Sequence, residues 1–401
     1  MREKLHVLIA GGGLGGLCLA QGLRGAGHSV TVFERDTDLE RKVGYRLHMN
    51  ADGGEALRNC LPAGLFELYL ETSRQTPPRQ LAVVVTDQLE ELSSMPHIGP
   101  PNEGPRPHTA VNRRTLRQIL LARLGDSIRL GAPVVSYEET ADGVRVRLAD
   151  GSSEEGDVLV GADGIRSAVR AQRLPEAVSV DTGIEGLGLY ARSALPPELQ
   201  AEIPSVLMDG FVIATDKRGG LLALGAFNPR RPLAEAAADL APDVRLDPVD
   251  DYMMVSGNVA EGTVVPPFAE WTESTATELR DSMLAAHADW HPALRGVVER
   301  IDPATMFAIY FGRLEPTPAW EPSRVTLLGD AIHAMLPTLG QGANLALRDA
   351  ATLAAALADG DDPVAAIGGY ETAMRGYAYP IMEAAADHSN FGGGGLGQRD
   401  E

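Results

Sequence analysis

The sequence has little cysteine, a shortage of basic residues and no long apolar run. Its two cysteines, Cys18 and Cys60, form neither a CxxC motif nor a disulfide framework, which is typical of a reducing compartment. No apolar stretch approaches the roughly 20 residues that span a bilayer. Residues 1–10 lack the apolar region and cleavage site of a secretory signal. We therefore expect a cytoplasmic location and no disulfide-stabilised scaffold.

The charge balance argues against polyanionic partners. The chain has 35 Lys and Arg against 55 Asp and Glu, for a net charge of −20. Such an acidic surface gives no electrostatic attraction to nucleic acid or to an anionic membrane. With 401 residues, of which 44% are hydrophobic, the chain can bury one large core or two modest ones. No metal-ligand pattern stands out, so we expect partners among small molecules, with the protein a monomer or a homodimer.

A glycine-rich motif lies near the N-terminus. Residues 6–10 have the pattern of a buried parallel strand, Gly11 to Gly16 satisfy G-x-G-x-x-G, and a helix is expected from Leu17 to Gly25. A second strand over 29–33 ends at Glu34, at the spacing where an acid accepts from a ribose hydroxyl. The pattern predicts a dinucleotide site without deciding between NAD and FAD. The residues expected to contribute are Gly11, Gly13, Leu14, Gly15, Gly16, Glu34 and Arg35.

Two further segments place polar residues after predicted elements. A helix is expected from Asn112 to Leu124, and Arg113 at its start is either a phosphate ligand or a surface arginine. A strand over 157–160 leads to Asp163 and Gly164, where the glycine frees the turn and Ser167 caps the next helix. By itself, this second segment fits an ordinary strand–turn–helix equally well.

The segment from Gly329 to Asn344 is the most informative part of the chain. It follows a buried-strand pattern over 324–328 and contains Asp330, a proline and two close glycines before a helix expected over 343–357. Backbone N–H groups at such a helix start can hold a polar, electron-rich ligand. His333 in this segment is interpreted as a buried histidine that orients the loop rather than as a catalytic group.

Together these segments resemble the group A flavoprotein monooxygenases, the single-component FAD-dependent aromatic hydroxylases with the para-hydroxybenzoate hydroxylase fold. The resemblance runs from Val7 to about Ala358 and rests on the ordered triple: Gly11–Gly16 with Glu34, Gly161–Gly164 with Arg166 and Ser167, and Gly329–Asn344. It implies an α/β fold in which a Rossmann-like, GR2-type FAD-binding domain is interleaved with a β-sheet substrate domain and followed by C-terminal helices.

Domain limits follow from that resemblance and from the strand signals. The FAD-binding domain is expected to take 1–72, 105–178 and 310–360, and the substrate domain 73–104 and 179–309. C-terminal helices are expected over 361–390 and a flexible tail over 391–401. Substrate-domain strands are expected at 81–86, 205–214, 221–227 and 252–255, with hairpin turns at 215–220 and, in the first domain, at 140–143.

The resemblance also implies roles for individual residues. Asp330 would accept from a ribitol hydroxyl, and the N–H groups at Gly340 and Gly342 would stabilise negative charge on reduced flavin. Further cofactor contacts are implied for Arg46, Arg113, Asp163, Gly164, Ala343 and Asn344. Pro337 would lie near the flavin and the reacting carbon, Gly340 would act catalytically through that charge stabilisation, and His48 is a catalytic candidate by position only. Candidate pocket walls are Phe211, Phe227, Tyr252, Met335 and Pro337.

The implied reaction is monooxygenation with FAD as cofactor and NADPH or NADH as co-substrate. O₂ would add to reduced flavin, and the resulting C4a-hydroperoxyflavin would transfer one oxygen atom to an aromatic or polyketide-like molecule. No second G-x-G-x-x-G follows a strand, so no separate NAD(P)H domain is expected. Baeyer–Villiger oxidation and epoxidation use the same chemistry, and a non-catalytic flavin-binding redox sensor or a plain NAD dehydrogenase stays open. A halogenase is disfavoured because W-x-W-x-I-P is absent.

Overall fold

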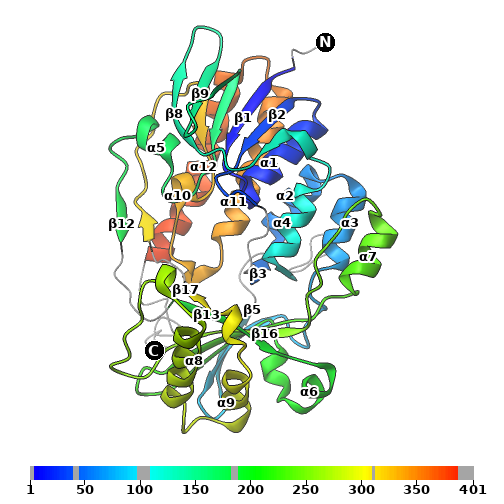
Figure 1. Ribbon diagram of the computed structural model, residues 1–401, viewed down its shortest axis with the longest axis vertical. Helices are drawn as coiled ribbons and strands as arrows, with labels where there is room; N and C mark the ends of the chain where they lie inside the picture. Colours follow the sequence, from blue (N-terminus) through cyan, green and yellow to red (C-terminus); the bar gives the residue numbers. More distant parts are fainter. Residues whose placement is uncertain (1–3, 39–44, 97–108, 182–187, 309–311, 387–401) are drawn as a thin grey trace.

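The computed structural model describes residues 4–38, 45–96, 109–181, 188–308 and 312–386, which form two layers (Figure 1). The upper layer in Figure 1 is built on a five-stranded sheet of order β19-β11-β1-β2-β7, and the lower on a seven-stranded sheet of order β17-β13-β16-β15-β14-β4-β5. The predicted tail, 391–401, lies outside the described residues. No helix in the described ranges is long and apolar enough to cross a membrane.

All neighbouring strands of the five-stranded sheet run parallel. The strands are β1 (His6–Ala10), β2 (Ser29–Phe33), β7 (Ile128–Arg129), β11 (Val158–Gly161) and β19 (Val325–Leu327). Their side chains are almost wholly buried apolar groups, as expected for strands covered on both faces. Because parallel strands end at the same edge, the loops that begin at Gly11, Glu34, Ala162 and Leu328 lie at one edge of this sheet.

Helices cover the parallel sheet and connect it to smaller sheets. The helices are α1 (Leu14–Gly25), α2 (Ala51–Cys60), α3 (Ala63–Glu71), α4 (Arg113–Leu121), α5 (Ala168–Arg173), α10 (Asp330–His333), α11 (Gly342–Asp359) and α12 (Pro363–Ala386). Two of the small sheets have two strands each: β3 (Arg46–Met49) with β6 (Thr109–Asn112), and β12 (Ser179–Asp181) with β18 (Gly312–Leu314). In the third, β9 (Val144–Leu148) lies between β8 (Val134–Glu139) and β10 (Ser153–Gly156). Helix α11 packs against α1, α2 and α12.

The seven-stranded sheet has one apolar face and one mixed face. Its strands are β4 (Leu81–Thr86), β5 (Glu91–Pro96), β13 (Leu189–Ala194), β14 (Phe211–Thr215), β15 (Leu221–Phe227), β16 (Tyr252–Gly257) and β17 (Phe307–Ala308). Val212, Leu224 and Val255 pack on one face against α8 (Glu273–Ala286) and α9 (Pro292–Glu299). Since side chains alternate along a strand, their neighbours project from the other face. Helix α6 (Pro197–Glu202) follows β13, and α7 (Leu233–Leu240) packs against α3 of the parallel-sheet layer.

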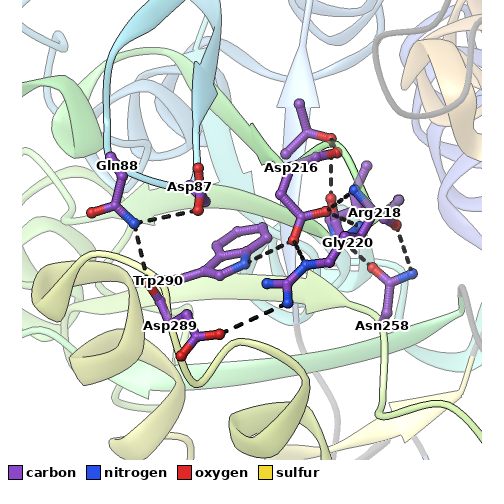
Figure 2. Close-up of polar contacts among 11 residues, drawn as sticks. Asp87, Gln88, Asp216, Arg218, Gly220, Asn258, Asp289 and Trp290 are labelled. Atoms are coloured by element: carbon purple, nitrogen blue, oxygen red, sulfur yellow. Dashed lines mark hydrogen bonds and ion pairs between the residues drawn. The ribbon is translucent and has the colours of Figure 1, made fainter.

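The turn between β14 and β15 is held by the carboxylate of Asp216 (Figure 2). Its Oδ1 accepts from the backbone N of Arg218 and of Gly220, each at 2.8 Å, and its Oδ2 accepts from Trp290 Nε1 at 3.2 Å. A carboxylate that accepts from its own turn mimics a backbone hydrogen bond and fixes the hairpin. The indole ties the hairpin to the residues preceding α9, so this cluster belongs to the architecture.

The α/β arrangement and both predicted hairpins are confirmed, and the differences lie at element boundaries. The strand expected over 205–214 is wrong in its first half, because Pro204 starts a 3-10 turn (Ser205–Met208) and β14 begins only at Phe211. The helix expected to reach Leu124 ends at Leu121, since Arg123 has a left-handed φ of 64°. In place of several C-terminal helices there is one within the described residues, α12, which continues through Pro380.

Candidate functional site

The glycine loop after β1 has two kinds of glycine. A Cβ at Gly11, Gly15 or Gly16 would come within 2.3, 2.8 or 2.2 Å of protein atoms, so these three serve close packing of strand, loop and α1. A Cβ at Gly13 would meet nothing within 4 Å. Gly13 also caps α1 with no side-chain partner, and Leu14 begins the helix with its side chain in the core. The open space and the helix N-terminus together form a cradle that suits a phosphate.

Glu34 is fixed at the end of β2 by groups from three segments. Its Oε2 accepts from Gly12 N and from Arg117 Nη2, both at 3.1 Å, and its Oε1 accepts from Asp36 N at 2.9 Å. Arg117 is buried and also donates through Nε to Gly12 O at 3.1 Å. Arg117 thus positions both the acid and the glycine loop. Arg35 is exposed, with Asp36 Oδ1 3.9 Å from its Nε.

Asp163 follows β11 and has one oxygen without a partner. Oδ2 accepts from Ala168 N at 2.8 Å, whereas Oδ1 is buried and has no hydrogen-bond partner. Burial raises the pKa of this carboxyl above its ordinary value, against the effect of the hydrogen bonds from Ser167 and the backbone. Gly164 has φ +80° and open space around it, and Ser167 caps α5 as predicted. A buried carboxylate oxygen without a protein partner can accept a hydrogen bond from a ligand or a water molecule.

The segment after β19 exposes an acid beside a helix start. Asp330 is exposed, and a Cβ on Gly342 would lie 3.8 Å from its Oδ1. Gly340 is left-handed with φ 60° and has open space around it. The first backbone bond into α11 runs from Leu345 N to Gln341 O, so the N–H groups of Gly342, Ala343 and Asn344 precede it. Such N–H groups are the unsatisfied donors of a helix N-terminus. Pro337 is half-buried at the start of the short turn that ends before Gly340.

The side chain of Asn344 joins two loops. Its Oδ1 accepts from Asn50 N at 2.9 Å, and its Nδ2 donates to His48 O at 3.0 Å and Gly340 O at 3.2 Å. A Cβ on Gly53 would come within 2.3 Å of that Oδ1, which explains the glycine. The side chain is therefore occupied by backbone groups, and only the Asn344 N–H is oriented with the helix start.

His333 is a buried structural histidine, in agreement with the preferred interpretation. Its Nε2 lies 2.6 Å from Asp349 Oδ2, which also accepts from Gly329 N at 2.8 Å. Asp349 Oδ1 accepts from Tyr377 OH at 2.7 Å. Burial alone would lower the pKa of His333, but the adjacent Asp349 carboxylate outweighs burial and raises it. The hydrogen bonds among His333, Asp349 and Tyr377 fix the turn that contains Asp330.

The two strands β3 and β6 carry the remaining predicted residues. Arg113 donates its backbone N to Tyr45 O at 2.8 Å, and its guanidinium carbon lies 5.8 Å from the Tyr45 ring centroid. His48 is half-buried in β3. Arg46 lies against the seven-stranded sheet rather than at the glycine loops, with Nε donating to Ala226 O at 3.2 Å.

Three of the predicted pocket residues share the mixed face of the seven-stranded sheet. Phe211, Phe227 and Tyr252 occupy the alternate positions, and Tyr252 OH accepts from Asn112 Nδ2 at 3.1 Å. Phe227 and Tyr252 are 0% and 3% exposed, so they pack inside the layer and form its base. Met335 lies elsewhere, packed with Leu314, Ala334 and Met382.

Sequence reasoning missed the aromatic and basic groups on the same face. Tyr190 stacks on Phe307 with ring centroids 5.6 Å apart, and Tyr45 lies 5.4 Å from Phe307. The guanidinium carbon of Arg192 is 4.7 Å from the Tyr252 ring centroid. Burial first, and then the neighbouring Tyr45, raise the pKa of Tyr190 to about 12. The alternation in Leu189–Ala194 was the available signal, since it places Tyr190 and Arg192 on one face.

The arrangement suits a long, flat, partly anionic ligand such as FAD. The open cradle at Gly13, the unpartnered Asp163 Oδ1, the exposed Asp330 and the helix start at Gly342 belong to one edge of the parallel sheet. Each offers what a dinucleotide requires: phosphate donors, hydroxyl acceptors and N–H groups for an anionic edge. The residues therefore fit FAD. Within the described ranges, no group of three His, Cys, Asp or Glu side chains could hold a metal ion.

Comparison with known proteins identifies the family. A family model described as FAD binding domain matches residues 4–362. The aurachin C monooxygenase/isomerase of Stigmatella aurantiaca is 30% identical, over 92% of this chain and 85% of that protein. A solved structure of a putative FAD-containing monooxygenase from Photorhabdus luminescens is 30% identical with a TM-score of 0.78, covering 97% of this chain and 98% of that chain.

Other relatives are longer or carry different reaction names. The dual O-methyltransferase/FAD-dependent monooxygenase elcB of Phaeosphaeria nodorum is 32% identical over 98% of this chain but only 45% of its own length. The chain thus spans less than half of that relative. Further relatives are named as a hydroxylase or as epoxidases. The chain belongs to the FAD-binding-domain family of single-component flavoprotein monooxygenases with the para-hydroxybenzoate hydroxylase fold, as its motifs predicted.

Proposed function

We propose that this chain is a monooxygenase that binds FAD, oxidises NADPH or NADH, and inserts one oxygen atom from O₂ into an aromatic or polyketide-like small molecule. The observation that carries the proposal is the set of unsatisfied polar groups at one edge of the parallel sheet. In the same molecule, a second sheet carries a mixed aromatic face suited to a ring system. Family membership supports the same reaction class.

Different residues would bind different parts of FAD. Glu34 accepts from the adenosine ribose, Gly13 and the start of α1 contact the diphosphate, and Arg113 supplies positive charge there. Asp330 accepts from a ribitol hydroxyl, and Asp163 Oδ1 accepts a further cofactor or nicotinamide donor. Bound FAD supplies hydride acceptance and oxygen activation. The N–H groups of Gly342, Ala343 and Asn344 stabilise negative charge at the flavin pyrimidine edge.

The substrate would lie over the mixed face of the seven-stranded sheet. Tyr190 and Phe307 offer aromatic surfaces at ordinary stacking distance. Arg192 offers a cation beside Tyr252. Pro337 and Gly340 would border the reacting carbon, and His48 is the proton-transfer candidate on β3. Burial by these apolar walls excludes water, which limits loss of activated oxygen as hydrogen peroxide.

Epoxidation is the second candidate, because relatives of similar identity are named zeaxanthin epoxidases. Baeyer–Villiger oxidation uses the same cofactor chemistry and stays an alternative. A redox sensor would bind FAD without substrate-stimulated turnover, and a plain NAD dehydrogenase would not bind FAD at all.

The test is a screen of NADPH and NADH oxidation by the FAD-loaded protein against phenols, quinones, aromatic acids and polyketides. We expect at least one compound to stimulate oxidation and to yield a product heavier by one oxygen atom, labelled when ¹⁸O₂ is supplied. The same assay without added compound measures uncoupled peroxide formation. Products that never gain oxygen would contradict the proposal, and an absence of any stimulation across these classes would favour the sensor.

A further inference from the structure

An arginine-lined cleft lies beside the start of β14, away from the glycine loops. It is open to solvent, and the space in and in front of it amounts to about 330 Å³. Arg46 comes from β3, Arg74 follows α3 and Arg230 follows β15, and all three line it with Gln75 and Thr109. Three cationic side chains in one cleft are unexpected in a chain with a net charge of −20.

Neither buried guanidinium is neutralised by a hydrogen-bonded carboxylate among the described residues. Arg46 and Arg74 are 5% and 3% exposed. Arg46 Nη2 donates to Gly210 O at 2.6 Å, and Arg74 donates to Asp209 O at 2.9 Å and Met208 O at 2.6 Å. The Asp209 carboxylate attracts Arg74 at longer range, but its Oδ2 accepts from Arg79 Nε at 2.9 Å and from Arg79 Nη2 at 2.6 Å.

Burial of the Arg46 and Arg74 guanidiniums destabilises their charged forms, and no carboxylate hydrogen-bonded to them offsets this effect. Burial lowers the pKa of Arg46 to about 10. Burial and then the charge of Arg46 lower that of Arg74 to about 9. Arg74 Nε is buried and has no hydrogen-bond partner. Buried charges in proteins are normally paired with an opposite charge, so two adjacent guanidiniums that donate only to backbone carbonyls leave a place for an anion.

A glycine in the seven-stranded sheet leaves space for the side chain of Arg46. A Cβ on Gly225 would come within 2.9 Å of Arg46 Cδ, so the glycine in β15 makes room for the side chain. The guanidinium carbon of Arg46 then lies 5.9 Å from the Phe211 ring centroid. Arg46 therefore connects the cleft with the mixed face of the seven-stranded sheet.

We propose that this cleft is a subsite for a compact oxyanion, a carboxylate or a phosphate group, held by Arg46, Arg74 and Arg230. A planar guanidinium fork matches either group through paired charge-assisted hydrogen bonds. The anion is the carboxylate of an organic acid that reaches the sheet face, or a phosphate from solution or from a nucleotide. The subsite stands on the protein's own groups and does not depend on the monooxygenase reaction.

The test is anion binding by the purified full chain, measured by calorimetry and by the thermal unfolding midpoint at constant ionic strength. Phosphate and benzoate are titrated separately, with chloride as the reference anion. We expect saturable binding that Arg230→Gln weakens about tenfold or more, as for loss of a hydrogen bond to a charged group. Arg230→Glu supplies an internal carboxylate and abolishes the response. The matched control is Arg145→Gln, since Arg145 pairs with Glu155 on the exposed β9–β10 hairpin.

The two anions distinguish the source of the ligand. Benzoate binding that exceeds phosphate binding assigns the cleft to an organic acid, and the reverse order assigns it to phosphate; both outcomes support the subsite when Arg230→Gln weakens them. Binding no stronger than that of chloride would overturn the proposal. So would binding that Arg230→Gln and Arg230→Glu leave unchanged while both variants keep the wild-type circular dichroism.

Discussion

Two aspartates that follow strands show how differently the same motif is used. Asp216 follows β14 and Asp163 follows β11, each with a glycine close behind. Burial raises the pKa of both carboxyls, but at Asp216 the hydrogen bonds from Gly220, Arg218 and Trp290 outweigh it and the net pKa is lowered. At Asp163 burial prevails, because one oxygen has no partner. A satisfied acid stabilises the fold, whereas an unsatisfied one marks a place for a ligand.

The largest effect is expected at Asp349, a buried acid on α11 whose oxygens are hydrogen-bonded to three groups. Asp349→Ala removes the partner of His333, Tyr377 and Gly329 N within a fully buried group. Breaking a buried pair costs about 3–5 kcal/mol, so the free energy of unfolding in urea should fall by about that much. Asp281→Ala, which removes an exposed acid beside Arg280, is the control and should change little. An equally small change for both would show that the His333 group does not hold the loop.

The next effect concerns binding and not the fold. Asp330→Ala removes an exposed acceptor at the edge assigned to FAD. We expect FAD affinity to fall by roughly tenfold to a hundredfold, the loss of about 1.5–3 kcal/mol typical of a hydrogen bond to a charged group. The thermal midpoint of the FAD-free protein should stay near the wild-type value. Unchanged FAD affinity, measured by flavin fluorescence quenching, would refute the ribitol assignment.

Asp216→Ala should lower the stability of the fold and leave FAD affinity unchanged. Loss of the acceptor for the turn N–H groups and for Trp290 should lower the free energy of unfolding by about 1–2 kcal/mol, with FAD affinity unchanged. Urea unfolding and FAD titration of the same preparation check both halves. If this variant lost FAD affinity as strongly as Asp330→Ala, the separation between architectural and ligand-binding acids would fail.

The smallest effect is a pH dependence at Asp163. A carboxyl whose pKa is raised in the folded state destabilises the fold when ionised, so stability falls as pH rises through the ordinary carboxyl range up to the raised pKa. Asp163→Asn should therefore make the FAD-free protein more stable near neutral pH. The difference should shrink as the pH is lowered toward 4. A variant that is less stable than wild type at neutral pH would contradict the assignment of the unpartnered oxygen.

Sequence alone predicted the loops assigned to FAD because their signals are local. Gly13, Asp163 and Asp330 each follow a strand within a few residues, and strand, turn and helix patterns identify such positions. The partners that fix them come from distant segments: Arg117 reaches Glu34, and Asp349 reaches His333. No local pattern predicts such contacts, so those residues were missed.

The substrate side was predicted less completely for the same reason. Phe211 and Tyr252 were found as aromatic residues in predicted strands, but Tyr190 and Phe307 become neighbours only when β13 pairs with β17. The cofactor contact of Arg46 stays a prediction, whereas its hydrogen bonds to Gly210 O and Ala226 O were missed because they depend on how the two layers pack.

The central claim is that the unsatisfied groups at the edge of the parallel sheet hold FAD, and titration of the purified, FAD-free chain with FAD tests it most directly. We expect saturable uptake of one FAD per chain, retained through gel filtration and accompanied by a rise in the thermal midpoint. A folded protein that stays colourless after incubation with excess FAD would contradict it.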